Sequence, residues 1–146
     1  MMEGVIQVAG AFLAIYAFSV ANDAPKKYLV YCGLTGAFGW AVYLIALPGC
    51  GVVFANFLGA GAIALASHIL ARVFKIPVTV FLIAGILTIV PGADLYRSVY
   101  HFCMGDQSLT EVYLERTIQI AGMIALAIFI VDSLFSAFWN RWKDKK

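Results

Sequence analysis

The chain has 146 residues, of which 63% are hydrophobic and only 12% are charged, and its formal net charge is +2. Soluble domains carry about 25% charged residues, so this composition excludes a water-soluble surface and is typical of a polytopic membrane protein. A small net charge without a basic groove also argues against a nucleic-acid partner. We therefore expect an all-α integral membrane protein with one membrane domain over residues 1–146, surrounded by the lipid bilayer.

Five apolar segments approach the length of about 20 residues that a helix needs to cross the hydrocarbon core. Turn residues and charges separate them, as at Pro25 with Lys26 and Lys27, and at Pro48 with Gly49. The sequence therefore predicts five transmembrane helices, at residues 4–21, 28–47, 52–74, 78–91 and 118–139. The first should remain in the mature protein, because no positively charged segment precedes it.

The positive charges favour one orientation of these five spans. If the amino terminus lies outside, only Arg97 and Arg116 fall on the outer side. The inner side then holds the other eight lysines and arginines, at positions 26, 27, 72, 75, 141, 143, 145 and 146. Because inner segments of membrane proteins are enriched in Lys and Arg, we expect a multi-pass membrane protein with its amino terminus outside. Its carboxyl terminus should lie in the cytoplasm.

Small residues recur at helical spacing in the second and third spans. Gly33, Gly36 and Gly39 mark one face of the second span, and alanines with Gly59 mark two faces of the third. Since lipid gives helices no hydrophobic reason to associate, close contact through small residues supplies much of the packing energy. The third span is therefore expected to be central.

The three cysteines show no spacing typical of a metal site. Cys32 lies within a predicted span and is expected to fill space as a small apolar residue. Cys50 and Cys103 both map to the outer side. Two readings of them stay open, a disulfide in an oxidising compartment or ordinary packing.

Pro91 and Gly92 interrupt the short fourth span, and residues 93–104 continue as an amphipathic segment. Its two faces carry Leu95, Val99, Phe102 and Cys103 on one side and Asp94, Arg97, Ser98 and His101 on the other. A helix broken at membrane depth is tolerated where its freed backbone groups line a cavity or are covered by protein, and such half-helices often bind solutes. We therefore predict a fourth helix broken at Pro-Gly, followed by an amphipathic helix.

Two interpretations of this segment are open. In the first, the amides of Gly92, Ala93 and Asp94 start a second half-helix and bind a substrate carboxylate, while Asp94 holds an ammonium group and Arg97 a second carboxylate. In the second, Asp94 and Arg97 form an internal ion pair in an interfacial helix, and His101 faces water.

Two further polar residues lie within predicted spans. Asp132 and His68 sit at similar depths, and a carboxylate facing lipid costs several kcal/mol unless it is paired or protonated. We hypothesise that they form a protonatable pair that couples transport to proton movement, because histidine titrates near neutral pH. The alternatives are that Asp132 bonds to Ser133 or Ser136 or reaches toward the interface, and that His68 is a satisfied packing residue.

The run Val90-Pro91-Gly92-Ala93-Asp94-Leu95-Tyr96-Arg97, with Gly105-Asp106 downstream and Asn22-Asp23-Ala24-Pro25 upstream, resembles the threonine/serine exporter (ThrE) family, in particular its small YjjB-like subunit. Thr88 stands where many relatives have a further proline. The resemblance implies a secondary exporter of small amino acids or related carboxylates in the cell (inner or plasma) membrane, which works with a larger companion half. The small-residue faces would then suit a heteromeric interface. The segment expected to bind substrate carries Pro91, Gly92, Asp94, Tyr96 and Arg97.

Other classes of function are less well supported by the sequence. An intramembrane enzyme would need a nucleophile with its base or a metal-ligand set, and the chain has no such motif. We therefore expect no catalytic residue, metal or cofactor. A structural or assembly subunit without direct substrate contacts remains the alternative, and homo-oligomerisation is left open.

Overall fold

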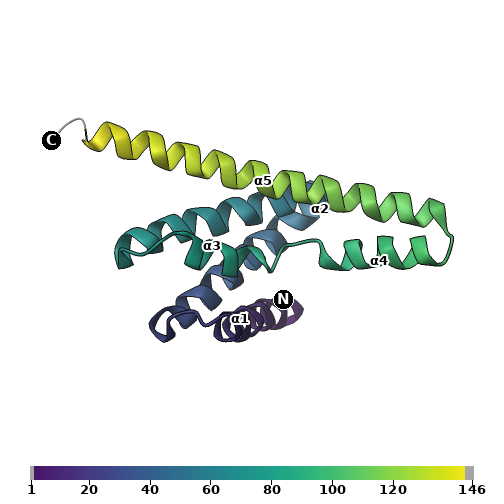
Figure 1. The fold of residues 1–146 in the computed structure, drawn as a ribbon, viewed down its shortest axis with the longest axis horizontal. Coiled ribbons are helices and arrows are strands. Elements are labelled where there is room, and N and C mark those ends of the chain that lie inside the picture. The colour runs from purple at the N-terminus through teal and green to yellow at the C-terminus, as the bar shows by residue number, and fades with distance from the viewer. Residues whose placement is uncertain (1, 144–146) are drawn as a thin grey trace.

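The computed structural model describes residues 2–143, and side chains over residues 2–137. All regular elements in this range are helices (Figure 1): α1 Met2–Ala21, η1 Lys26–Tyr28, α2 Leu29–Phe74, α3 Thr79–Ile86, α4 Gly92–Cys103 and α5 Gln107–Lys143. The all-α fold class is confirmed. Three segments are long and apolar enough to cross a membrane: Met2–Ala21, Lys26–Phe74 and Gln107–Ala137. Asp144, Lys145 and Lys146, at the end of the chain, lie outside the described residues.

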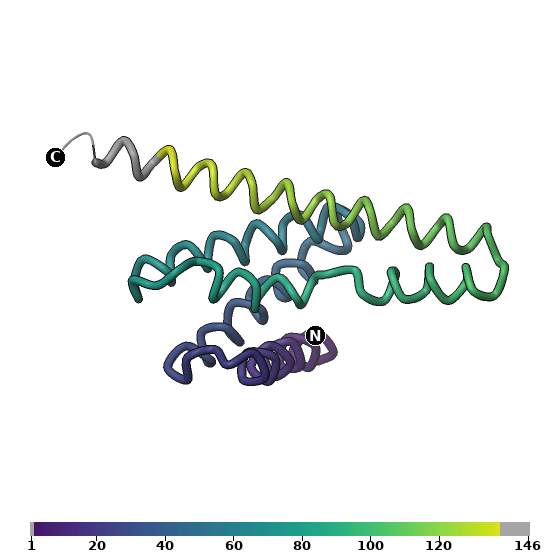
Figure 2. Tube along the Cα trace, viewed as in Figure 1, coloured from purple at the N-terminus to yellow at the C-terminus, as the bar shows by residue number. Residues whose placement is uncertain are grey.

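The 46-residue helix α2 bends sharply near its middle. Gly51 has φ 73° and ψ 169°, which is not helical, and Pro48 lies just before it. Glycine reaches positive φ without a Cβ clash, and proline removes a backbone hydrogen bond, so the chain changes direction here. The first half of α2 (residues 29–50) and the second half (residues 52–74) therefore form two rods (Figure 2), close to the two separate segments predicted.

Glycines in the first half of α2 allow close contact with neighbouring helices. A Cβ at Gly33 would lie 2.8 Å from the Phe12 ring, and one at Gly36 would lie 2.6 Å from Ile15, so both positions press against α1. A Cβ at Gly39 would collide with Ile63. This small-residue face of the second predicted span is thus filled by residues of the chain itself.

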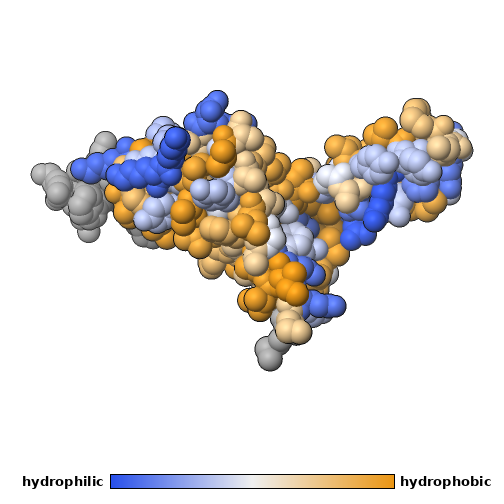
Figure 3. All heavy atoms as spheres, turned by 90° about the horizontal axis from the view of Figure 1, so that it is seen from below, coloured by the Kyte–Doolittle hydropathy of each residue, from blue (hydrophilic) through white to orange (hydrophobic). Residues whose placement is uncertain are grey.

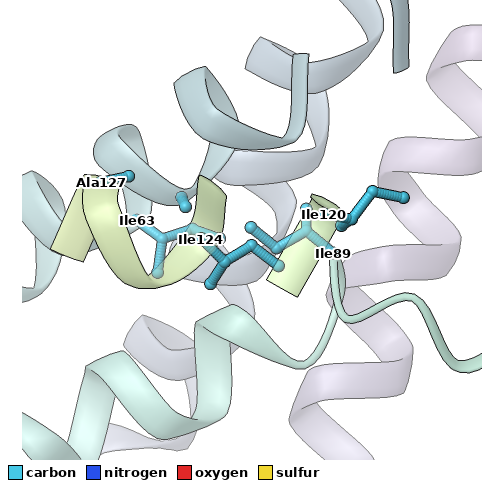
Figure 4. Close-up of a cluster of buried hydrophobic side chains, with 6 residues drawn as sticks. Ile63, Ile89, Ile120, Ile124 and Ala127 are labelled. Atoms are coloured by element: carbon cyan, nitrogen blue, oxygen red, sulfur yellow. The ribbon is translucent and has the colours of Figure 1, made fainter. Parts of the chain in front are cut away.

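The main apolar core lies where the second half of α2, the segment after α3, and α5 meet. Figure 4 shows Ile63 beside Ile89 and Ile124, and all three are at most 8% exposed. Ile63 also occupies the space left by Gly39 on the first half of α2 and by Gly85 on α3, since a Cβ at Gly85 would lie 2.8 Å from it. Because Ile63 lies at the centre of this packing, the third predicted span is central, as expected.

The boundaries of the later helices differ from the prediction. Helix α3 ends at Ile86, and α4 begins at Gly92, so the short fourth segment is helical over fewer residues than expected. Helix α5 begins at Gln107 rather than near residue 118. The Asp106 carboxylate caps it, accepting hydrogen bonds from the Leu109 amide at 3.2 Å and the Ser108 hydroxyl at 2.8 Å. Hydropathy marks only the apolar part of α5, so it placed this start too late.

Helix α4 and the first turns of α5 form a hairpin, here called the arm, that extends away from the other helices (Figure 1). In Figure 2 the α1–α2 and α2–α3 connections lie at the left end, whereas the bend of α2 and the arm lie toward the right. Figure 3 shows hydrophobic residues over much of the body and hydrophilic residues gathered at the left end and on the arm. The molecule therefore has two polar ends separated by an apolar body.

Candidate functional site

An ion-pair cluster joins the start of α4 to α5. The Asp94 carboxylate lies 3.3 Å from the Arg116 guanidinium and 4.0 Å from that of Arg97, and its side chain is 13% exposed. The Arg97 pairing was one of the two interpretations of the sequence. Arg116 was missed as a site residue, because the sequence placed it in a loop. The only signal for it was a single arginine ahead of the last apolar span.

The polar face of α4 turns toward α5, and its apolar face turns outward. Ser98 is 3% exposed, and the His101 ring stacks on Tyr113 with 5.6 Å between centroids. In contrast Tyr96 is 70% and Phe102 is 71% exposed. His101 therefore packs against a neighbour instead of only facing water, and Tyr96, a predicted substrate residue, points away from the Asp94 cluster. In a soluble helical hairpin the apolar faces would pack together and the polar faces would point to water, so α4 shows the reverse arrangement.

The break between helices α3 and α4, at residues 87–91, leads into an exposed helix start. Gly92 and Ala93 are exposed, and a Cβ at Gly92 would meet nothing within 4 Å. The Gly92 amide already donates to the Val90 carbonyl at 2.8 Å, so of the three predicted amides those of Ala93 and Asp94 remain in the unpaired first helical turn. A pocket of about 400 Å³ next to the break is lined by Thr88 and Trp40 rather than by the predicted residues.

A second cluster lies between the second half of α2 and α5. The structure brings His68 and Asp132 together, with Nε2 of the imidazole against the carboxylate. Arg72 completes the cluster: its guanidinium lies 3.3 Å from His68 Nδ1 and 4.3 Å from the centre of the Phe135 ring. The Phe135 ring also stacks on the imidazole at 4.6 Å.

The geometry of this cluster fixes the role of each imidazole nitrogen. A guanidinium can only donate, so Nδ1 of His68 accepts from Arg72, and Nε2 carries the hydrogen that it donates to Asp132. The His68 side chain is 13% exposed and that of Asp132 is 49% exposed. Arg72 and Phe135 were not singled out in the sequence, although His68 and Arg72 are spaced four residues apart on one helix face.

The Asp106 carboxylate that caps α5 lies outside the apolar segments, and its pKa is shifted. Hydrogen bonds from the Leu109 amide and the Ser108 hydroxyl hold the pKa of Asp106 below its ordinary value of 3.8. All three cysteines are free thiols: Cys32 is fully buried, as predicted, while Cys50 and Cys103 are exposed. Within residues 2–137, no group of three His, Cys, Asp or Glu side chains is arranged to hold a metal ion.

The chain matches a known sequence family over most of its length. A family model described as "Threonine/Serine exporter, ThrE" matches residues 7–134. The chain belongs to the threonine/serine exporter family. The charged residues of both clusters and the whole arm fall within the matched range.

A curated relative gives the scale of the shared region. The "Threonine/serine exporter" of Corynebacterium glutamicum is 35% identical over 102 residues, which are 70% of this chain and 20% of that protein. This exporter-family chain therefore spans about a fifth of the length of the curated relative that it matches. No solved structure matches it.

Proposed function

We propose that this chain is the small half of a secondary exporter of threonine, serine or related small carboxylates. The family match over residues 7–134 carries the proposal. The proposed larger companion half supplies the remaining machinery, and the greater length of the Corynebacterium glutamicum relative supports this division. The complex resides in the cell membrane.

The proposed membrane arrangement has five spans with the amino terminus outside. Helix α1, the two halves of α2 and α5 supply four of them. Helix α3 has eight residues, or about 12 Å of rise, so the fourth span is a broken one in which the turn at 87–91 and the start of α4 continue it. Lys26, Lys27, Arg72 and Lys75 then share the cytoplasmic end, which agrees with the positive-inside bias.

The proposed substrate contact on the outer side involves the Asp94 cluster and the break before it. Pro91 and Gly92 end the α3 segment, and the amides of Ala93 and Asp94 begin the half-helix that receives a carboxylate. The substrate carboxylate competes with Asp94 for Arg97 and Arg116, which frees Asp94 for an ammonium group. Tyr96, stacked on Tyr100 at 6.3 Å between centroids, lies on the outward face of α4 and is left out of this contact.

The proposed coupling group is the His68–Asp132 pair. Both residues lie in apolar segments, and one proton shared between them is held or released as the exporter changes state. Arg72 places a fixed positive charge beside His68 in the same cluster. Proton movement through this pair would drive export.

A direct assay measures efflux of labelled threonine from preloaded cells that express the chain with its companion. We expect wild-type cells to release threonine faster than cells with an empty vector, and Asp94→Ala and Arg97→Ala to slow release. Glu111→Gln, an exposed carboxylate change on α5, is the matched control. Equal release from wild-type and empty-vector cells would contradict the export proposal.

A second candidate is a structural subunit whose companion makes all substrate contacts. The observation that favours it is the pairing of Asp94 with Arg116, which already satisfies the charges of the outer cluster. In that case Asp94→Ala, Arg97→Ala and Gly92→Leu would leave export unchanged as long as the complex still assembles. Co-purification of the companion with each variant measures assembly independently of transport.

A further inference from the structure

Helix α5 has its neighbours on one side. Within the described residues it packs against α2 and α4, which both lie to the same side of it in Figure 1. Its buried side chains recur at steps of four and three residues, so they form one stripe toward these neighbours: Ile120, Ile124, Ala127 and Val131. The opposite side, here called the outward face of α5, follows the same helical spacing and consists of exposed residues: Ile118, Gly122, Ala125, Phe129 and Ser136.

The middle of the outward face of α5 is small and open. A Cβ at Gly122 would meet nothing within 4 Å, and Ala125 follows almost one turn later. Gly36 of α2 lies on a comparable small-residue face, but there Ile15 of α1 fills the space, since a Cβ would lie 2.6 Å from it. Because small residues let membrane helices approach closely, the outward face of α5 has room for a further helix.

The carboxylate of Asp132 borders this face, because it lies three residues after Phe129. Its side chain is 49% exposed, and Oδ1 is the oxygen that faces the His68 imidazole. Within residues 2–137, Oδ2 has no hydrogen-bond donor beside it. Asp132 belongs to the apolar segment Gln107–Ala137, and its partner His68 precedes Lys75 by about 10 Å of helix rise. Lipid tails donate no hydrogen bonds, so a donor on another membrane helix would stabilise this oxygen.

The charges along the outward face of α5 distinguish a second copy of the chain from a different chain. Two copies in one membrane have the same orientation, so facing copies would place Asp132 at the depth of Asp132 and the exposed Glu115 at that of Glu115. Within residues 107–137 the only cation of α5 is Arg116, and it turns to Asp94 on the other side. Opposed like charges disfavour association, so the face does not complement itself.

We propose that the outward face of α5 binds a transmembrane helix of a different chain, and that a side chain of this helix donates a hydrogen bond to Oδ2 of Asp132. The inference rests on the proposed exporter complex, in which the larger companion half supplies that helix. The Corynebacterium glutamicum relative has the necessary extra length, since the matched region is only 20% of it.

The first test is photo-crosslinking in intact membranes that contain the chain and an epitope-tagged companion. The photoreactive p-benzoylphenylalanine replaces Phe129, which is 69% exposed, and in the control it replaces Ile45, which is 81% exposed on the first half of α2. We expect an adduct that contains both the chain and the tag, with a clearly higher yield from position 129. Equal yields, a product of two copies of the chain, or no protein adduct from position 129 would overturn the proposal.

The second test fills the open space on the outward face of α5. Gly122→Leu and the control Gly10→Leu on α1 both enter empty space in the chain itself, so both variants should keep its fold. The amount of companion that co-purifies with each molecule of the chain should fall by about tenfold in Gly122→Leu, because overpacking disturbs the helix contact. Gly10→Leu should retain the companion. Equal retention by the two variants would contradict the contact.

These tests are independent of the transport measurement. A wild-type complex that exports threonine without an adduct at position 129 would contradict the proposed contact and leave the export proposal standing. A wild-type complex that releases no more threonine than the empty vector, and still gives the adduct with the companion, would contradict export and support the contact.

Discussion

The two charged clusters use the same kind of contact, a carboxylate that accepts from a side-chain nitrogen, in different surroundings. In the arm, Asp94 pairs with Arg116 and Arg97, which keep their charge at any physiological pH. In the body, Asp132 pairs with His68, whose imidazole can exchange a proton as a guanidinium cannot. The arm cluster also joins helices that are adjacent in the chain, whereas His68 and Asp132 are 64 residues apart. The comparison teaches that the arm cluster is a local ionic contact, while the body pair joins two distant parts of the chain and is the one proposed above to carry a proton.

Removing the titratable pair should have the largest effect on activity. Asp132→Asn keeps the shape of the side chain but leaves His68 without its charged acceptor, and a charge-assisted bond contributes about 1.5–3 kcal/mol. We expect proton-dependent efflux to fall by about tenfold or more. Efflux measured across a series of imposed pH gradients tests this, with Ser133→Ala as the neighbouring control. A variant with unchanged pH dependence would remove the distinction between the two clusters.

The second-largest expected effect is a difference in stability between packing variants of the body and of the break before the arm. Gly36→Leu inserts a side chain where even a Cβ would lie 2.6 Å from Ile15, whereas Gly92→Leu enters open space. Overpacking costs about 1–3 kcal/mol, so Gly36→Leu should lower the melting temperature in detergent clearly and Gly92→Leu only slightly. Thermal unfolding followed by circular dichroism provides the comparison. Similar losses for both variants would mean that the break packs as tightly as the body.

The permanent ion pair should contribute less to stability. Arg116→Gln removes the 3.3 Å contact to Asp94, and Arg97→Gln removes the one at 4.0 Å. Both arginines are about half exposed, so solvent screening limits each effect to about 1 kcal/mol or less, with the larger value for Arg116. Limited proteolysis of the arm at low and high salt measures this. High salt should reduce the difference between wild type and Arg116→Gln.

The smallest effect concerns the start of α5. Because the pKa of Asp106 is below its ordinary value of 3.8, its capping contribution is fully present above that pH. It is lost as the pH falls through the lowered folded-state pKa. Hydrogen exchange of the amides at 107–110 should therefore rise below about pH 4 in wild type. Asp106→Ala should show fast exchange at all pH values, and equal exchange in the two proteins at pH 6 would contradict the capping role.

The sequence predicted those parts of the fold that depend on local sequence patterns. The end of α1 at Ala21 and the bend near Pro48 follow from turn residues, and the partnership of His68 with Asp132 follows from two polar residues at matching depth. The start of α5 was missed because a polar helix carries no hydropathy signal. Arg116 was missed with it, since its role depends on the antiparallel pairing of α4 and α5.

The small-residue faces show a second limit of sequence reasoning. The spacing of Gly33, Gly36 and Gly39 correctly marked a face for close helix packing. It could not name the partner, because periodicity describes one helix and the partner depends on the tertiary arrangement. Phe12, Ile15 and Ile63 occupy that face.

The bend at Gly51 has a practical consequence for mapping this protein in cells. The two halves of α2 meet without a connecting loop, so an inserted epitope tag has no tolerant position there. The neighbouring thiol of Cys50 is free and exposed, as is Cys103 at the end of α4, while Cys32 is buried. In the orientation proposed above, an impermeant maleimide applied to intact cells should therefore label Cys50 and Cys103 and leave Cys32 unlabelled.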